Sequence, residues 1–316
     1  MKITVLDGFT TSQNDLSWDG LSACGDVTIY DNTKAEDIVS RLIDSDIALT
    51  NKVVVDRQIM AQLPKLRYIG VLATGYNVVD VEAAHEYGIT VTNVPAYSTD
   101  SVAQMVFAHL LNVSNGVHAY ACDNRMGIWS CQENFCYINA PQREIASMSI
   151  GIIGLGNIGI KVAEIAHAFG MKVYAVTSKS VDDLPSYICK SSREHVFSTV
   201  DVISLHCPCY ADTAGMINAD SISMMKDGVI IINTGRGPLV VERDVAIALE
   251  NGKIGAYCAD VMSQEPPPAD NVLLANKNVY TTPHIAWATS EARQRLMNTA
   301  IDNVKAFING CPVNVL

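Results

Sequence analysis

Basic residues are scarce in this sequence. Its 316 residues include 22 lysines and arginines against 33 aspartates and glutamates, so the formal net charge is −11 at pH 7. A surface with this balance repels the phosphates of nucleic acids and anionic lipids. The composition therefore argues against nucleic acid or a membrane as a partner, although local N–H groups and a single arginine can still bind a small anion.

Long hydrophobic runs and paired cysteines are also missing. No apolar stretch approaches the roughly 18 residues needed to cross a bilayer, and the first residues, 2–7, form a strand-like run and not a secretion signal. The nine cysteines include no C-x-x-C pair. The Cys207-Pro208-Cys209 sequence has no partner pair at zinc-ligand spacing, so we predict no metal site. We expect a cytoplasmic protein with reduced thiols.

Strand-like apolar runs alternate with helical patterns along the chain. This alternation predicts an α/β fold with parallel sheets covered on both faces. A long helix is expected from about Ser101 to Tyr120, with candidate caps at Ser98, Thr99 and Asp100. Before it, strands are expected at 3–6, 27–30, 47–50, 68–72 and 90–93.

An aromatic-bearing segment with little periodicity follows this helix, from Arg125 to Arg143. It carries Trp129, Phe135, Tyr137 and Pro141. Such a segment in an enzyme suggests a subunit contact or the rim of an active site. A loop packed on its own domain is the alternative.

A glycine-rich loop follows the strand-like run at 149–153. The sequence Gly154-Leu155-Gly156-Asn157-Ile158-Gly159 has the spacing G-x-G-x-x-G and leads into a helical pattern and a second strand at 171–176. The first glycine permits a tight turn, the second lets backbone N–H groups approach a pyrophosphate, and the third allows close packing of helix on strand. The helix directs its positive end at the phosphates. The complete unit predicts a dinucleotide-binding site.

The acidic residue that usually follows the second strand, where it holds a ribose 2′-hydroxyl, is missing. This strand ends in Thr177, Ser178 and Lys179. The lysine could pair with a 2′-phosphate, so NAD(H) and NADP(H) both stay open as cofactors. Asp182 and Asp183 follow closely, and a solvated loop lysine is the alternative interpretation.

A weaker version of the strand, glycine turn and helix pattern lies at 69–88. Its turn contains Thr74 and Gly75. One interpretation is a second anion-binding turn, for a substrate carboxylate. The other is that any two units of this kind look alike.

Two polar residues follow strand-like runs in the last third of the chain. Arg236 comes after the apolar run 229–233, and Asp260 lies near the end of the run 255–261. Open α/β sheets bind ligands at the carboxyl ends of their strands. A guanidinium there can hold a carboxylate with two hydrogen bonds and polarise a carbonyl. Asp260 is expected either to bind a nicotinamide carboxamide or to cap the next turn.

A histidine and a glutamate complete the candidate chemistry. His284 closes the run 278–283, and Glu265 opens the Pro266-Pro267-Pro268 turn. A carboxylate beside an imidazole favours the imidazolium and fixes its tautomer, so the other ring nitrogen can donate a proton. We interpret the pair as an acid/base unit.

These motifs resemble the D-isomer-specific 2-hydroxyacid dehydrogenases along nearly the whole chain. The resemblance is carried by 151–159, His206-Cys207-Pro208, 233–237, Asp260-Val261, Glu265-Pro266 and Pro283-His284. The sequences 71–77, 97–104 and 284–289 look most like the glycerate dehydrogenase (hydroxypyruvate reductase) branch. Departures from the family pattern are Thr177 for an acidic residue, Gln104 for glutamate and Gly235 for alanine.

The resemblance implies a domain plan and a set of contacts. A Rossmann nucleotide-binding domain at 99–287 would be inserted into a flavodoxin-like substrate domain formed by 1–98 and 288–316, and the nucleotide domain would build a homodimer. Catalysis would use Arg236, Glu265 and His284, and the substrate would also meet Thr74, Gly75 and Trp287. The implied cofactor contacts are Gly154, Gly156, Asn157, Ile158, Thr177, Ser178, Lys179, Cys207, Pro208, Thr213, Thr234, Gly235, Asp260, His284 and Ala286.

The implied activity is hydride transfer to a 2-oxo acid, with His284 as the proton donor. Hydroxypyruvate is favoured because Ala73, Thr74 and Gly75 are small, but glyoxylate, pyruvate and phenylpyruvate stay open. A redox-sensing interaction protein on the same fold, like the corepressors related to this family, is the alternative from another class. A formate-oxidising enzyme is disfavoured because that pattern has glutamine in place of Glu265.

Overall fold

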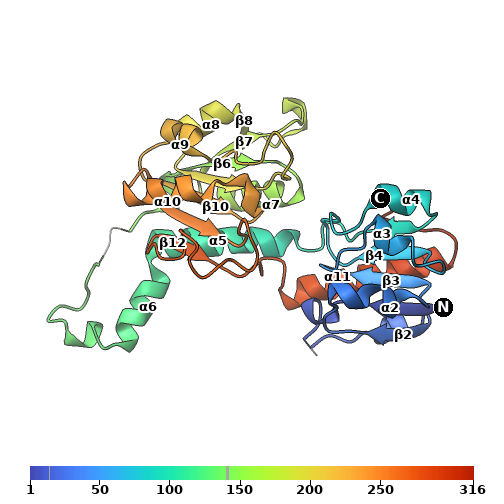
Figure 1. Cartoon of the computed structure of the whole chain (residues 1–316). Helices are drawn as coiled ribbons and strands as arrows, with labels where there is room; N and C mark the ends of the chain where they lie inside the picture. Colours follow the sequence, from blue (N-terminus) through green and yellow to red (C-terminus); the bar gives the residue numbers. More distant parts are fainter. Residues whose placement is uncertain (14, 140–141) are drawn as a thin grey trace. The chain divides into compact units, whose positions relative to one another are not determined.

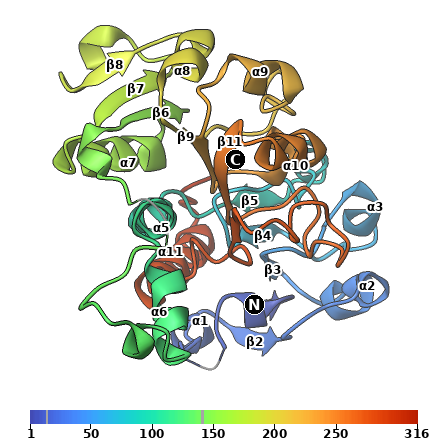
Figure 2. The same cartoon turned by 90° about the vertical axis from the view of Figure 1, so that its left-hand side faces the viewer.

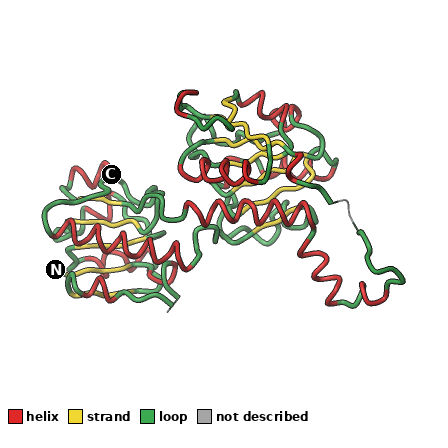
Figure 3. Tube along the Cα trace, turned by 180° about the vertical axis from the view of Figure 1, so that it is seen from behind, coloured by secondary structure: helices red, strands yellow, loops and turns green. Residues whose placement is uncertain are grey.

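The chain forms two compact units, each built on its own parallel sheet. The computed structural model describes residues 1–13, 15–139 and 142–316. One unit combines Met1–Ser98 with Ala288–Leu316, and the other is Thr99–Trp287. In each unit, helices enclose the strands (Figure 3). The predicted α/β fold with two parallel-sheet units is therefore confirmed.

The first unit contains a five-stranded parallel sheet in the order β2-β1-β3-β4-β5. This is the flavodoxin-like order, in which the direction of winding reverses between β1 and β3. All residues of β3 and β4 are buried, as expected of apolar runs inside a parallel sheet. The strands are β1 (Lys2–Val5), β2 (Asp26–Ile29), β3 (Ile47–Thr50), β4 (Tyr68–Val71) and β5 (Thr90–Thr92).

The last helix of the chain returns to this first sheet, so red and blue segments lie together in Figure 1. The ring of Phe307 on α11 (Ser290–Ile308) lies 4.8 Å from the buried ring of Tyr68 on β4. The two ends of the sequence therefore share one core, and the unit is discontinuous in sequence. The other helices of the unit are α1 (Asp19–Ser22), α2 (Ile38–Leu42), α3 (Arg57–Met60) and α4 (Val81–Glu86).

The second unit contains a seven-stranded parallel sheet in the order β12-β11-β10-β9-β6-β7-β8. If these strands are numbered 1 to 7 along the chain from β6 and the sheet is read from its β8 edge, the order is 3-2-1-4-5-6-7. This is a Rossmann order, and the direction of winding reverses between β6 and β9. The strands are β6 (Ser149–Ile153), β7 (Lys172–Val176), β8 (Ile188–Lys190), β9 (Val202–Leu205), β10 (Val229–Asn233), β11 (Ile254–Ala259) and β12 (Val279–Thr281).

Side chains of the central strands alternate between two cores, one on each face of this sheet. Ile230 and Ile232 of β10 pack in the core with α5 (Thr99–Asn115) and α7 (Asn157–Ala168). Ile231 packs in the opposite core, with the helices seen on the other side of the sheet in Figure 2. The two-residue period of a strand explains this division. The helices of the opposite core are α8 (Arg193–Thr199), α9 (Ala219–Met224) and α10 (Glu242–Glu250).

The single helix predicted from Ser101 to Tyr120 is wrong. The structure has two helices, α5 and α6 (Val117–Arg125), which are separated at Gly116. This glycine has a left-handed backbone, with φ of +63°. Glycine adopts that conformation without the steric cost of a Cβ, and it commonly ends helices for this reason.

Helix α6 begins an arm that extends away from the sheet of its own unit (Figure 1). No residue of α6 is buried. The arm is held by its own contacts: the rings of Tyr120 and Tyr137 lie 5.6 Å apart, and the indole N–H of Trp129 donates to the carbonyl of Phe135. Pro141, which the sequence interpretation included here, lies outside the described residues.

No helix within the described ranges combines the length and the apolar composition that a membrane crossing needs.

Candidate active site

The glycine-rich loop has the geometry of a phosphate-binding turn. It joins β6 to α7 at the point where the strand order of the second sheet reverses. Gly154 has φ of +94°, and a Cβ on it would lie 2.7 Å from the backbone nitrogen of Cys207. A Cβ on Gly159 would collide with the carbonyl of Gly154. Both glycines are thus required by close backbone contacts.

The space in front of this loop suits a pyrophosphate. A Cβ on Gly156 would meet no atom within 4 Å, so the cradle beside it is open. Gly156 is also the N-cap of α7, and no side chain caps the first N–H groups of this helix. Such N–H groups, together with the positive end of a three-turn helix, bind phosphates. Asn157 and Ile158 lie in the first turn, where the sequence analysis expects them to contact the cofactor.

A buried hydroxyl at the same sheet edge also fits a bound ligand. Thr234 follows β10, and its Oγ1 is buried without a hydrogen-bond partner in the part of the chain that the structure describes. Buried hydroxyls are nearly always hydrogen-bonded in complete structures. The observation agrees with a nicotinamide dinucleotide as the missing partner.

Two lysines lie together at the ends of the neighbouring strands β7 and β8: Lys190 is the last residue of β8, and Lys179 follows β7. The ammonium of Lys190 donates to the carbonyl of Lys179 at 2.5 Å. The backbone N–H of Lys179 donates to the hydroxyl of Thr177. Where a ribose-binding carboxylate is usual, this edge therefore presents Thr177, Ser178 and two cations.

The turn that carries Arg236 is fixed by a buried asparagine. Asn233 is fully buried; its amide donates to the carbonyl of Arg236 at 2.9 Å, and its Oδ1 accepts from the N–H of Gly235 at 3.1 Å. The Arg236 side chain itself is exposed at the carboxyl end of β10. Sequence analysis missed the role of Asn233, although a polar residue at the end of an otherwise apolar strand is a usable signal.

His284 and Glu265 form a direct pair. The Nδ1 atom of His284 lies 2.6 Å from Oε2 of Glu265, and the two side chains are 29% and 35% exposed. The other carboxylate oxygen of Glu265 accepts from the backbone N–H of Met262. With Nδ1 bound to the carboxylate, Nε2 is the ring nitrogen that can exchange a proton with a substrate.

The backbone of His284 is held in an uncommon conformation. Its φ is +54°, a left-handed value that few residues other than glycine adopt. Its carbonyl accepts from the indole N–H of Trp287 at 2.8 Å. Backbone strain of this kind gathers at functional sites, where the surrounding structure must maintain it.

Asp260 provides much of that surrounding structure. Its carboxylate is 2% exposed and accepts hydrogen bonds from the hydroxyl of Thr282 at 2.6 Å and from the N–H groups of Ile285 and Ala286 at 2.9 and 2.8 Å. Of the two roles that sequence analysis left open for Asp260, the structure displays the capping of the turn. A contact with the nicotinamide carboxamide stays a prediction.

Two other histidines of this unit, His109 and His206, are largely shielded from solvent. Burial lowers the pKa of His206 to about 4, and its Nε2 lies 2.7 Å from the hydroxyl of Ser204. His206 is therefore neutral at pH 7. Burial also lowers the pKa of His109, although the nearby Asp260 opposes this shift. His284 has both solvent access and a carboxylate partner, so it is better suited to proton transfer than either of these.

The remaining predicted site residues have local roles. The hydroxyl of Thr213 donates to the carbonyl of Pro208, and so shapes the loop after Cys207. In the first unit, the hydroxyl of Thr74 donates to the carbonyl of Val94 at 2.8 Å, which fixes the Thr74-Gly75 turn after β4. Their contacts with a cofactor or substrate stay predictions.

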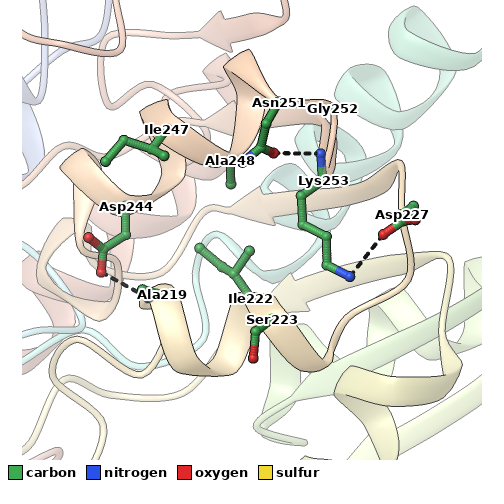
Figure 4. A pocket seen from close by; sticks show the side chains of 10 residues that line it. All are labelled: Ala219, Ile222, Ser223, Asp227, Asp244, Ile247, Ala248, Asn251, Gly252 and Lys253. Atoms are coloured by element: carbon green, nitrogen blue, oxygen red, sulfur yellow. Dashed lines mark hydrogen bonds and ion pairs between the residues drawn. The ribbon is translucent and has the colours of Figure 1, made fainter.

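A groove of about 470 Å³ lies away from this site, between α9, α10 and the turn before β11 (Figure 4). It opens at the amino-terminal end of β10 and β11, opposite the glycine loop. Its charged groups are already paired: Lys253 donates to Asp227 at 2.9 Å, and Asp244 accepts from the N–H of Ala219. The groove does not offer the chemistry found at the carboxyl edge.

The domain description "D-isomer specific 2-hydroxyacid dehydrogenase, NAD binding domain" matches residues 107–286. The chain belongs to this family. It is 44% identical to a hydroxypyruvate reductase of Blautia hydrogenotrophica over 100% of this chain and 99% of that protein. It is 40% identical to a glycerate dehydrogenase of Methylorubrum extorquens, over 91% of this chain and 90% of that protein.

Two solved structures have folds similar to that of this chain. An acyclic imino acid reductase in complex with NADPH and D-Arg is 31% identical, with a TM-score of 0.88 and full coverage of both chains. A D-lactate dehydrogenase from Aquifex aeolicus with NAD and lactic acid is 28% identical, with a TM-score of 0.84 over 98% of this chain and 96% of that chain. The prediction of a nicotinamide-dependent D-2-hydroxyacid dehydrogenase, an oxidoreductase acting on CH–OH groups, is confirmed.

The carboxylate of Asp260 is expected to control activity through the turn that carries His284. We predict that Asp260→Asn lowers kcat roughly 10²-fold, because misplacement of a reacting group by about 1 Å has an effect of this size. Thr282→Val, which removes one donor and leaves the carboxylate, should lower kcat less. Steady-state kinetics at saturating dinucleotide measure both. An Asp260→Asn enzyme with normal kcat and a raised KM for the dinucleotide would contradict this role and favour the carboxamide contact.

Proposed function

We propose that this enzyme reduces hydroxypyruvate to D-glycerate, with His284 as the proton donor. The chemistry is supported by the 2.6 Å contact between His284 and Glu265, at the sheet edge that also carries Arg236 and the glycine loop. The substrate is supported by the printed functions of relatives that are 44% and 40% identical, hydroxypyruvate reductase and glycerate dehydrogenase.

In this proposal, Arg236 binds the substrate carboxylate through two parallel hydrogen bonds and polarises the adjacent carbonyl. Thr74 and Gly75 contribute backbone N–H groups to the same carboxylate, and Trp287 borders the substrate. A bound nicotinamide cofactor supplies the hydride. The product is the 2-hydroxy acid, whose new C–H bond comes from that hydride and whose O–H proton comes from His284.

The proton is delivered by the Nε2–H of the imidazole. Glu265 accepts the Nδ1–H and so fixes the ring orientation. The carboxylate also stabilises the imidazolium, which must be present before the carbonyl oxygen gains negative charge. After proton transfer, the neutral imidazole keeps its Nδ1–H on Glu265 and regains a proton at Nε2 from solvent.

Removal of the imidazole tests this assignment. His284→Ala should lower kcat for hydroxypyruvate reduction by roughly 10²- to 10⁴-fold, the usual contribution of general acid catalysis. The dissociation constant of the dinucleotide, measured by fluorescence titration, should change little. His195→Ala, at an exposed histidine of α8, is the matched control and should keep normal kinetics. Near-normal turnover of His284→Ala would exclude His284 as the acid.

We further propose that the enzyme accepts NADPH as well as NADH. Thr177 replaces the carboxylate that would repel a 2′-phosphate, and Lys179 and Lys190 lie beside it. The imino acid reductase structure described above, which contains NADPH, is consistent with this proposal.

Cofactor preference should respond to these two lysines. Lys179→Ala and Lys190→Ala should each lower kcat/KM for NADPH about tenfold, because a hydrogen bond to a charged group contributes roughly 1.5–3 kcal/mol. The kcat/KM for NADH should change less than about threefold, because NADH has no 2′-phosphate to accept that hydrogen bond. Lys172→Ala, at the exposed start of β7, serves as the control. The proposal fails if the unaltered enzyme uses NADPH at least about a hundredfold less efficiently than NADH, a gap of nearly 3 kcal/mol.

We also propose a homodimer built through the arm of the second unit. Phe135, Ile138 and Met126 on this arm are 89%, 77% and 69% exposed. Several large apolar side chains gathered on a projecting segment favour a protein partner. The nine cysteines all lie within the described ranges and form no disulfide there, which supports our proposal of a cytoplasmic location.

A further inference from the structure

One carboxylate holds both ends of the loop that carries Glu265. Glu242 is the first residue of α10, and its Oε1 accepts from the backbone N–H of Ser263 at 2.8 Å. Its Oε2 accepts from the amide Nδ2 of Asn271 at 2.7 Å. Glu265 lies between these two anchor points in the chain. Because a charged acceptor makes stronger hydrogen bonds than a neutral one, the carboxylate restrains the loop at both ends.

The far end of this loop is also connected to the protein core. The Oδ1 atom of Asn271 accepts from the backbone N–H of Leu273 at 2.9 Å, while its amide group donates to Glu242. Leu273 is fully buried, in the same core as Val245 and Leu249 of α10. Asn271 therefore ties the loop to a helix and to a core that do not depend on the loop for their own packing.

The near end of the loop packs against the turn that carries Arg236. A Cβ on Gly237 would lie 1.9 Å from the carbonyl oxygen of Met262 and 2.5 Å from the backbone nitrogen of Ser263, so only glycine allows this approach. The same nitrogen of Ser263 donates to Glu242. The start of the loop is thus held both by the Arg236 turn and by the carboxylate of Glu242.

The loop has little conformational freedom between its anchors. Three prolines, 266–268, follow Glu265 directly, and each proline ring fixes its own φ. The backbone N–H of Asn271 donates to the carbonyl of Pro268 at 3.0 Å. We therefore expect a shift at either anchor to reach the carboxylate of Glu265 and to change its contact with His284.

We propose that Glu242 is a positioning residue for the acid/base pair, whose carboxylate keeps Glu265 within hydrogen-bonding distance of His284. The inference rests on the proposed function, in which His284 donates the proton. An acidic residue in the first turn of a helix ordinarily interacts with the helix dipole alone. Here both carboxylate oxygens of Glu242 bind another segment, the one that carries Glu265.

The consequence is that turnover and substrate binding respond differently to Glu242. In the proposed function, Arg236 binds the substrate carboxylate, and the side chain of Asn233 fixes the turn of Arg236 through two hydrogen bonds of its own. Loss of the Glu242 carboxylate should therefore slow proton transfer and leave substrate binding nearly unchanged. Such a loss appears in kcat and not in KM.

The first test is Glu242→Ala. Its kcat for hydroxypyruvate reduction should fall roughly 10- to 100-fold, because misplacement of a reacting group by about 1 Å has effects up to this size. Its KM for hydroxypyruvate should change less than about threefold. Glu250→Ala removes an exposed glutamate at the other end of α10 and is the matched control, with normal kinetics expected.

A reciprocal exchange tests the contact between Glu242 and Asn271. Asn271→Asp alone should lower kcat, because two carboxylates then face each other. In the double variant Glu242→Gln/Asn271→Asp, donor and acceptor are exchanged and the hydrogen bond can form again, while Ser263 keeps its acceptor. The kcat of the double variant should recover to within about threefold of the unaltered enzyme. A folded double variant that is as slow as Asn271→Asp would overturn the proposal.

A second background separates this role from general stabilisation of the fold. In Glu265→Gln, the further change Glu242→Ala should lower kcat less than about twofold, because the residue through which Glu242 acts is already altered. An equal loss in both backgrounds would mean that Glu242 acts elsewhere. Normal kcat in Glu242→Ala would mean that the loop does not need this carboxylate. Either result overturns the proposal.

Thermal melting establishes that each variant is folded, and if Glu242→Ala is not, the Asn271→Asp and double variants decide the question. Failure of the proposed function is recognised separately. It would appear as absent hydroxypyruvate turnover in the unaltered enzyme, or as normal turnover in His284→Ala, whatever the Glu242 variants do.

Discussion

The contact between Glu265 and His284 is the interaction on which the proposed chemistry depends. A lone imidazole can rotate and can carry its proton on either nitrogen. The carboxylate of Glu265, itself held by the N–H of Met262, fixes Nδ1 as the bonded nitrogen. In the proposed function, the other nitrogen gives its proton to the substrate, and the carboxylate stands beside the ring to balance a positive charge on it.

Each unit uses one buried aspartate to fix a loop at the carboxyl edge of its sheet. Asp260 holds the turn that carries His284, and Asp7, which follows β1, accepts from the backbone N–H groups of the loop 51–53. Both carboxylates accept three hydrogen bonds and are nearly inaccessible to solvent. Loops are otherwise the most mobile parts of an α/β fold. Buried carboxylates with several hydrogen bonds therefore fix the backbone of loop residues at the carboxyl edge of each sheet.

The positions of the strands could be predicted from the sequence, because buried parallel strands are continuous apolar runs. Ile47–Thr50 was predicted with its observed bounds, and most other strands differ by one or two residues. The break at Gly116 was missed because helical apolar periodicity continues through it. The pairing of Glu265 with His284 was anticipated from residue types and from the family resemblance.

The roles of Asp7 and Thr282 could not be read from the sequence. Asp7 accepts from backbone N–H groups of a loop far along the chain, and Thr282 donates to the carboxylate of Asp260. Nothing in either residue type says which segment it will meet. Asp7 and Lys52 are 45 residues apart, and only the pairing of β1 with β3 brings them together. Their shared position, just after or at the end of an apolar strand, becomes informative once the strand order is known.

The most direct test of the central claim is a double-mutant cycle on Glu265 and His284, measured as kcat for hydroxypyruvate reduction. If Glu265 acts through His284, the double variant Glu265→Ala/His284→Ala will be no slower than His284→Ala alone. If the two losses instead multiply, Glu265 contributes independently of the imidazole, and the account of the pair as one acid/base unit is contradicted.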